Sequence, residues 1–319
     1  MNHFVCCNPN ATREAQNVMR FFSEIYGKRM LTAQHSNKNS LQDFERIHEV
    51  TGQYPAIIGI DLASIGRGAK PYYHSGGEIE FNLGSVEMAI DWVKEHKSLV
   101  TVCWHWHSPT GYQQTHSFWK KYTTFDLPKV MLEKGIDYHL LLEDMDEVAE
   151  TLKKFQKENI PVLWRPLHEA NGAHFWWGNE PAPFLELYHL MYDRFTCLHG
   201  LNNLIWVWNG EEPQLYPGDD CVDISGLDIY NLPYNSGTLE KQFRAMDTIT
   251  HGDKPLAITE VSSPPDMEKL QDEKIPWLWF MLWYGFVDNK DNNTHELVKA
   301  AYNHPYAMSE KDLREYHIY

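Results

Sequence analysis

Two glutamates in this sequence stand where short apolar runs come to an end. Glu169 follows the run from 161 to 164, and Glu260 lies near the end of the run from 255 to 261. Flat aromatic side chains come soon after the first glutamate, at Phe175, Trp176 and Trp177. A half-buried carboxyl group can donate a proton near neutral pH, and aromatic rings offer faces to the C–H groups of sugars. The combination favours cleavage of a sugar polymer by a pair of carboxyl groups.

An ion pair between Glu169 and Arg165 is the structural alternative for the first glutamate. An arginine and a glutamate four residues apart often pair on a helix, but on a strand they lie ~13 Å apart. The residues around Glu169 leave this ion pair open, and the second carboxylate, Glu260, is what favours a catalytic role.

The elements that would position these carboxylates are eight apolar runs separated by amphipathic helical patterns. Continuous apolar runs are typical of strands in a parallel sheet that is covered on both faces. We predict strands at 29–35, 55–61, 99–107, 161–164, 204–209, 222–230, 255–261 and 277–284. We predict helices at 11–28, 40–51, 85–97, 127–158, 183–199, 238–250 and 294–302. This alternation indicates an α/β fold, a (β/α)8 TIM barrel that forms a single domain over residues 1–319.

The carboxyl ends of the strands are where barrels of this kind hold their active sites. The fourth and seventh strands, which lead to Glu169 and Glu260, are three positions apart, so their ends lie on opposite walls of one central pocket. Two carboxyl groups ~5–5.5 Å apart suit a retaining glycosidase, in which one is the nucleophile and the other the general acid and base. The other strand ends carry polar or aromatic side chains: Gln34, His35, Asp61, His105, His107, His168, Trp208, Asn209, Asp228, Tyr230 and Trp283.

The acidic composition argues against some classes of partner. The 319 residues include 44 acidic and 28 basic side chains, a net charge of −16, which disfavours binding to nucleic acid or to an anionic membrane. No apolar run reaches the ~18 residues of a membrane span. The five cysteines show neither a disulfide framework nor metal-site spacing. The first residues lack a signal-peptide pattern, so we expect an intracellular protein, or a secreted or periplasmic one if a signal peptide was removed.

The stretch from Trp164 to Gly178 resembles a signature of glycoside hydrolase family 26, in which β-mannanases predominate. The matching pattern is W-R-P-L-H-E-x-N-G-x-x-F-W-W-G. Three further segments match in the expected order: Trp104-His105-x-x-Ser108-Pro109, Leu227-Asp228-Ile229-Tyr230-Asn231 and Thr259-Glu260-Val261. The resemblance covers about residues 15–305. It implies a monomeric, retaining endo-β-1,4-mannanase that acts on β-mannan or manno-oligosaccharides without a cofactor or a metal.

The resemblance also implies a role for each residue of the site. Glu169 would be the general acid and base, and Glu260 would be the nucleophile. Tyr230 would hydrogen-bond to Glu260, and Trp283 would form the apolar floor under the sugar that precedes the cleaved bond. The other residues implied to bind the substrate are His105, His168, His174 and Trp177.

Two questions about the histidines stay open. Many family members carry a tryptophan where this chain has His174, so the subsite beyond the cleaved bond is expected to be more polar, with a changed product pattern or linkage preference. His107 shares a strand face with His105 and is a second candidate for the sugar ligand, although we favour His105. These two residues and His168 are also conceivable zinc ligands, but the two glutamates and the aromatic floor already account for the pocket.

The mode of action and the substrate also have more than one reading. The loops 66–84 and 108–126 are candidates for closing one end of the cleft, which would give an exo-acting mannobiohydrolase. Xylan or mixed-linkage β-glucan could replace mannan as the substrate, and a non-catalytic mannan-binding protein is the possibility outside the enzyme class. Trp208 and Asp228 suit either the barrel core or direct sugar contact. Distal subsites or surface packing are both compatible with Tyr72, Tyr73, His74 and Trp119.

Overall fold

The computed structural model describes residues 3–178, 180–230, 234, 237–316 and 318. Within them the strands are β1 (Met30–His35), β2 (Ile57–Asp61), β3 (Leu99–Cys103), β4 (Val162–Arg165), β5 (Leu204–Asn209), β6 (Ile224–Ile229), β7 (Leu256–Val261), β8 (Trp279–Leu282) and β9 (Ala307–Met308). The α-helices are α1 (Arg13–Ile25), α2 (Gln42–Thr51), α3 (Glu78–Phe81), α4 (Ser85–His96), α5 (Leu127–Glu133), α6 (Ile136–Lys157), α7 (Pro181–Asp193), α8 (Glu240–Ile249), α9 (Met267–Glu273), α10 (His295–Tyr302) and α11 (Glu310–Leu313).

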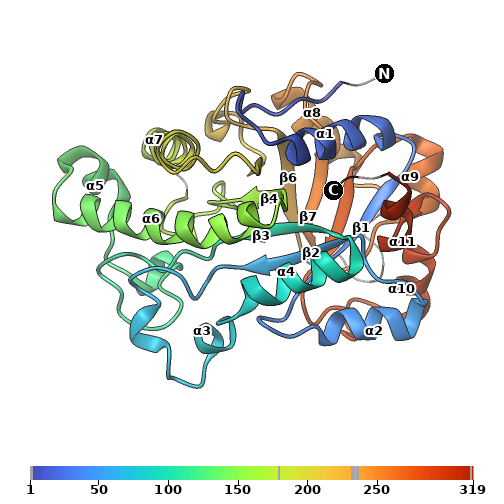
Figure 1. Cartoon of the computed structure of the whole chain (residues 1–319), viewed down its shortest axis with the longest axis horizontal. Helices are drawn as coiled ribbons and strands as arrows, with labels where there is room; N and C mark the ends of the chain where they lie inside the picture. The colour runs from blue at the N-terminus through green and yellow to red at the C-terminus, as the bar shows by residue number, and fades with distance from the viewer. Residues whose placement is uncertain (1–2, 179, 231–233, 235–236, 317, 319) are drawn as a thin grey trace.

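Strands β1 to β8 form a closed parallel barrel. Each strand pairs in parallel with the next one in the sequence, and β8 pairs with β1 to close the ring. The short strand β9 adds a parallel pairing to β1. Helices connect the strands and lie outside them (Figure 1). The prediction of a (β/α)8 TIM barrel is therefore confirmed.

Burial on both faces explains why the strands appear as continuous apolar runs. All six residues of β5 and all six of β7 are buried, because one face of each strand fills the barrel while the other packs against helices. Local signals set the helix ends. Thr12 accepts a hydrogen bond from the Ala15 N–H and begins α1, and Gly52, with φ of 73°, ends α2. Among the described residues, no helix combines the length and apolar character needed to cross a bilayer.

Two differences between the predicted boundaries and the structure have a clear local cause. Strand β3 ends at Cys103 and not at residue 107, because the Asp61 carboxylate accepts the His105 N–H at 3.0 Å and takes it out of the strand ladder. The helical region predicted at 127–158 is interrupted at Lys134, which has φ of 48°, and at Gly135. Short elements that the periodicity did not indicate are α3, α9, α11 and β9.

A bulge in β7 turns Glu260 toward Asp228. Leu227 on β6 pairs with Ile258 on β7, but the next residue, Asp228, pairs with Glu260, so Thr259 is an extra residue on β7. Gly226 makes room for it, because a Cβ at that position would lie 2.6 Å from the Thr259 Cγ2. The bulge therefore brings two acidic side chains side by side at the carboxyl end of the barrel.

Candidate active site

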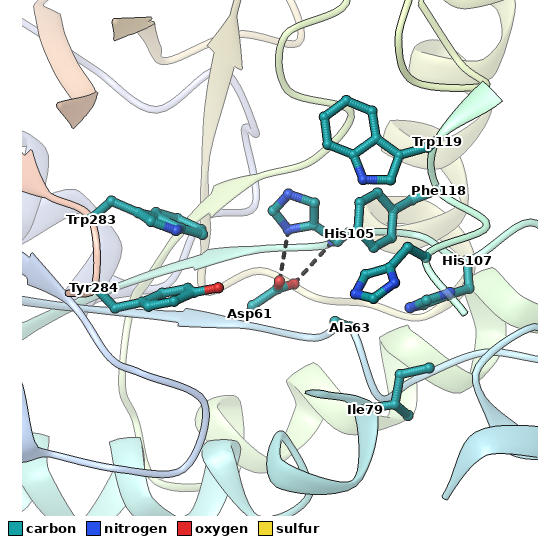
Figure 2. A pocket seen from close by; sticks show the side chains of 10 residues that line it. Asp61, Ala63, Ile79, His105, His107, Phe118, Trp119, Trp283 and Tyr284 are labelled. Atoms are coloured by element: carbon teal, nitrogen blue, oxygen red, sulfur yellow. Dashed lines mark hydrogen bonds and ion pairs between the residues drawn. The ribbon is translucent and has the colours of Figure 1, made fainter. Parts of the chain in front are cut away.

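Two hollows lie among the residues at the carboxyl ends of the strands. The first has a volume of about 230 Å³, and its walls include Asp61, His105, His107, Phe118, Trp119 and Trp283. Figure 2 shows Trp283 and Tyr284 on one side of this hollow and Phe118 and Trp119 on the other, with Asp61 and His105 between them. The second hollow has a volume of about 210 Å³, and its walls include Glu169, Gly172, His174, Asn209, Glu211 and Asp228.

Glu169 stands in the loop after β4 in an unusual backbone conformation. Its φ is 52°, and that of Leu167 is 50°, both in the left-handed region that non-glycine residues rarely adopt. The Asn209 side chain at the end of β5 accepts the Glu169 N–H at 2.7 Å and holds the turn in place. The Glu169 side chain is 25% exposed, so its carboxyl group can reach a ligand in the second hollow. Strain of this kind is common where a fold presents a functional side chain.

Glu260 is buried and held at both carboxylate oxygens. Arg165 donates from Nη2 to Oε1, and Tyr230 donates from its hydroxyl to Oε2. Oxygen atoms of Glu169, Asp228 and Glu260 lie within 4.8 Å of one another. This separation is close to that of the carboxyl pair in retaining glycosidases.

Arg165 bridges two acids rather than pairing with Glu169. Its Nη1 donates to Asp228 Oδ2 at 2.6 Å, and its Nη2 donates to Glu260. An ion pair between Arg165 and Glu169, which the sequence left open, is therefore not what the structure contains. Burial raises the pKa of Glu260, while the Arg165 charge and the Tyr230 hydrogen bond act in the opposite direction and favour the ionised form.

A chain of contacts joins the Asp61 carboxylate to the two site histidines, His105 and His168. The Asp61 Oδ2 is 2.7 Å from His105 Nδ1, and His105 Nε2 is 3.2 Å from His168 Nε2. Burial lowers the pKa of His105, but the Asp61 carboxylate outweighs burial and raises it above the usual value. Burial, together with the Arg165 charge, lowers the pKa of His168 well below its usual value. The lowered pKa keeps the His168 ring neutral, and one of the two facing Nε2 atoms donates a hydrogen bond to the other.

Trp283 follows β8 and rests on a histidine that sequence reasoning left without a role. The ring centroids of Trp283 and His35 are 3.9 Å apart, and the rings are inclined by 31°. Burial lowers the pKa of His35 to about 4, so the supporting ring is neutral. His35 is the last residue of β1. Its position at a strand end is the feature of the sequence that could have indicated a place in the site. Trp283 thereby presents a fixed aromatic surface to the first hollow.

The other predicted site residues lie at different depths. His107 and His105 both line the first hollow, so the structure brings both candidates to it. His174 lines the second hollow and contacts Glu169, with 2.7 Å between His174 Nε2 and Glu169 Oε2. Trp177 is completely buried, and its indole N–H donates to the His168 carbonyl at 3.0 Å. In this structure Trp177 therefore supports the wall from behind and offers no surface to a ligand.

The structure also locates residues for which the sequence allows two possible roles, either in the barrel core or surface packing, or in sugar binding. Trp208 is buried in the core, whereas Asp228 lines the second hollow and bonds to Arg165 and Thr259. Trp119 lines the first hollow. Tyr73 donates its hydroxyl proton to the Ser64 carbonyl at 2.7 Å. Asn231, the last residue of one resembling segment, lies outside the described residues.

Potential metal ligands gather at this site, but the protein itself satisfies them. One group is Asp61, Cys103 and His105, and the other is Glu169, Asp228 and Glu260. Both Asp61 oxygens bond to His105, through its backbone N–H and its ring. The Arg165 guanidinium provides the positive charge next to Asp228 and Glu260. The donor set therefore fits internal ion pairing and hydrogen bonding better than coordination of a cation.

The hydrogen bond from Tyr230 to Glu260 makes a testable prediction. We expect Tyr230→Phe to lower kcat about 10- to 100-fold, because a hydrogen bond to a charged group contributes about 1.5–3 kcal/mol. The change also removes an influence that lowers the Glu260 pKa. The family resemblance implies that Glu260 is the nucleophile, which acts only when ionised, so activity would be lost as pH falls through this pKa. The acidic limb of the pH–rate profile should therefore move to higher pH.

The matched control for this change is Tyr54→Phe. Tyr54 also donates its hydroxyl proton to a glutamate, Glu45, at 3.0 Å, but its ring packs against helices α2 and α4. We expect the control to keep the wild-type pH–rate profile. A Tyr230→Phe profile that coincides with the control would contradict the role of this hydrogen bond.

Known proteins resemble the chain over almost its whole length. The sequence profile of glycosyl hydrolase family 26 matches residues 7–312. A mannan endo-1,4-beta-mannosidase of Thermothelomyces thermophilus is 35% identical over 316 residues, which are 96% of this chain and 63% of that protein. A mannan endo-1,4-beta-mannosidase A of Piromyces sp. is 32% identical over 320 residues, which are 98% of this chain and 51% of that protein.

Solved structures agree with the sequence comparison. The crystal structure of a Podospora anserina GH26-CBM35 beta-(1,4)-mannanase superposes with a TM-score of 0.90 at 32% identity, covering 98% of this chain and 70% of that one. A beta-mannanase from a symbiotic protist of the termite Reticulitermes speratus superposes with a TM-score of 0.86 at 25% identity, covering 98% and 99% of the two chains. The chain spans only 51% to 63% of the length of the two curated relatives above.

Proposed function

The chain belongs to glycosyl hydrolase family 26, and from this membership we propose that it is a retaining endo-β-1,4-mannanase. Its substrates are mannan-type polysaccharides and manno-oligosaccharides. The observation that carries the proposal is the carboxylate pair, in which oxygens of Glu169 and Glu260 lie within 4.8 Å of each other. The mannanase names of several relatives support the choice of sugar.

In the first step of the proposed mechanism Glu260 attacks the anomeric carbon and Glu169 protonates the departing oxygen. Arg165 and Tyr230 hold Glu260 ionised and oriented for this attack. In the second step Glu169 removes a proton from water, and the water oxygen displaces Glu260 from the anomeric carbon. Two displacements on the same carbon restore its configuration, so the product retains the β configuration of the substrate.

The two hollows suggest how a chain of sugars would lie. The sugar before the cleaved bond would rest on Trp283 in the first hollow, with His105 and His168 at its hydroxyl groups. The sugar after the cleaved bond would occupy the second hollow, beside Glu169 and His174. Neutral hydroxyl groups suit this lining, which combines rings with hydrogen-bonding side chains.

A time course of product sizes tests the proposal. Linear β-1,4-mannan and mannohexaose are incubated with the protein, with xylan and barley β-glucan beside them, and every product size is resolved. A mixture of manno-oligosaccharides from the first minutes is the expected result. Activity on xylan or β-glucan with none on mannan would overturn the choice of sugar while keeping the carboxylate mechanism. Binding of mannan without release of reducing sugar would overturn the enzymatic proposal.

An exo-acting mannobiohydrolase is the second candidate function. Its support is that both long loops reach the first hollow, Ile79 from the loop 66–84 and Phe118 with Trp119 from the loop 108–126. A loop that closes the far end of this hollow would admit only two sugars. Mannobiose as the single early product would favour this candidate over the endo-acting enzyme.

The proposed function also bears on where the protein acts and on its oligomeric state. A polysaccharide does not cross a membrane, so we propose that the protein acts outside the cytoplasm, secreted or periplasmic. We also propose that it acts as a monomer, because both carboxylates and both hollows come from one chain. Light scattering after size-exclusion chromatography tests the monomer, and a measured mass of two chains would contradict it.

A further inference from the structure

The contact between His174 and Glu169 assigns a specific task to this histidine. The distance from His174 Nε2 to Glu169 Oε2 is 2.7 Å, which is a hydrogen bond to the carboxyl group proposed as the general acid and base. We propose that His174 is a positioning residue that holds the Glu169 carboxyl group for proton transfer in both steps of the reaction. This inference rests on the proposed glycosidase function and goes beyond a sugar-binding role for His174.

Within the described part of the chain, the orientation of the Glu169 carboxyl group depends on one side-chain hydrogen bond, whereas two hydrogen bonds orient the Glu260 carboxylate. Both oxygens of Glu260 accept hydrogen bonds, from Arg165 and Tyr230. Among the residues that the structure describes, the side-chain hydrogen bond of Glu169 is the one to His174. The neighbouring charged groups Asp228 and Glu260 are acidic and repel an ionised Glu169 rather than hold it.

Both the backbone and the imidazole ring of His174 are held in place by neighbouring residues. The backbone N–H of Lys120 donates to the His174 carbonyl at 2.6 Å. The ring packs against Trp119, with centroids 5.3 Å apart, and against Phe175 at 4.5 Å. Lys120 and Trp119 belong to the long connection after β3, so that segment fixes a side chain located after β4.

Gly172 gives the ring the space that it occupies. A Cβ at this position would lie 2.1 Å from His174 Cε1 and 2.4 Å from Nδ1. The φ of Gly172 is not in the left-handed region, so its backbone does not itself demand glycine. An alanine there would displace the imidazole, because a side chain can rotate away from the added Cβ while the surrounding backbone stays in place.

A histidine suits a carboxyl group that alternates between two protonation states. The ring nitrogen donates a hydrogen bond when Glu169 is ionised and accepts one when Glu169 is protonated and the ring is neutral. Glu169 is protonated before the first step and ionised before the second. One contact can therefore keep the carboxyl group in position through the whole catalytic cycle, where a permanent cation would serve the ionised state alone.

Two substitutions separate positioning from packing. His174→Phe keeps a ring against Trp119 and Phe175 but removes the nitrogen, whereas His174→Gln removes the ring but keeps a side-chain N–H. General acid–base catalysis raises a reaction rate about 10²- to 10⁴-fold. We expect His174→Phe to forfeit part of this gain, so that kcat/KM on mannohexaose falls about 10- to 100-fold. His174→Gln should be at least about fivefold more active than His174→Phe, because a side-chain amide can still donate to Glu169.

A substrate that needs no proton gives the decisive comparison. The bond to 2,4-dinitrophenolate breaks without protonation, so kcat/KM on 2,4-dinitrophenyl β-mannobioside reports the first step without a general acid. We expect His174→Phe to change this value less than about threefold. Equal losses on both substrates, or a His174→Phe enzyme more active on mannohexaose than His174→Gln, would overturn the proposal in favour of packing.

Gly172→Ala supplies an independent test of the same contact. In the wild-type background it should lower kcat/KM on mannohexaose by about the same factor as His174→Phe, because it displaces the imidazole. In the His174→Ala background it should add less than about a twofold loss, and additive losses would overturn the proposal. Wild type and Glu169→Ala serve as references. If the wild-type protein cleaves no β-linked glycan, the proposed function is overturned. If wild type is active and Glu169→Ala is not, but the effects of Gly172→Ala and His174→Ala simply add, only the positioning role is overturned.

Discussion

Glu260→Ala is expected to lower kcat/KM on linear β-1,4-mannan by at least about 10⁴-fold, because the variant has no group to attack the anomeric carbon. The fold should survive the change. Arg165 carries one positive charge between two buried acids, and after the substitution it still has its 2.6 Å ion pair with Asp228. The buried charges would then balance, so the activity loss should come without a comparable loss of stability.

An added nucleophile identifies the missing group by stereochemistry. Azide is small enough to enter the space vacated by the Glu260 side chain and attack the anomeric carbon from that face. Glu169 remains to protonate the departing oxygen, so mannohexaose should give a glycosyl azide by a single displacement. One displacement inverts the carbon, and the product should be the α-azide. Proton NMR of the isolated azide distinguishes α from β.

Glu310→Ala is the matched control for Glu260→Ala. Glu310 is also a buried glutamate that pairs with an arginine, Arg314 at 3.0 Å, but it lies in α11. We expect this control to keep wild-type activity per folded molecule and to form no azide product. A Glu260→Ala enzyme that retains more than about 1% of wild-type activity, or that forms the β-azide, would show that another group is the nucleophile.

The barrel was predictable because its strands are buried on both faces. Burial of this kind selects continuous apolar runs, and each run in the sequence coincides with a strand of the structure. Strand ends also predicted residues that the structure brings to the candidate active site, since Glu260, Asp228 and Tyr230 stand at or just beyond the ends of β6 and β7. Pattern alone thus places chemical side chains at one end of a parallel barrel.

The contacts within the site depend on features that leave no periodic signal. The bulge at Thr259 adds one residue to β7 and decides which acid lies beside Asp228. Arg165 stands four residues before Glu169, but the barrel brings it to Glu260, which is 95 residues away. Such pairings arise from closure of the sheet, and spacing along the chain carries no information about them.

The burial of individual site side chains was also not predictable from residue type. Trp177 belongs to the long resembling motif, yet it is completely buried behind Phe175, with ring centroids 4.6 Å apart. His35 drew no functional role from the sequence, yet it supports the face of Trp283. A tryptophan suits a core as well as a sugar platform. Only the three-dimensional arrangement decides which surface a given ring presents.

The second large effect is expected for Glu169→Ala, with a pattern that differs from that of Glu260→Ala. On linear β-1,4-mannan kcat/KM should fall about 10³-fold, because a sugar leaving group needs a proton. On 2,4-dinitrophenyl β-mannobioside kcat/KM should change little, since Glu260 can still attack and the leaving group departs as an anion. The covalent intermediate then accumulates, because no base activates water for the second displacement.

Azide should release that intermediate and give the β-azide, because two displacements at the same carbon retain its configuration. Glu211 is the carboxyl group to compare, since it lines the same hollow as Glu169 and burial raises its pKa, as suits a proton donor. If Glu211 were the acid and base, Glu211→Ala would show the substrate pattern and the azide product, and Glu169→Ala would show neither. We expect the opposite, because Glu169 is the residue whose backbone the Asn209 side chain anchors and whose carboxyl group His174 contacts.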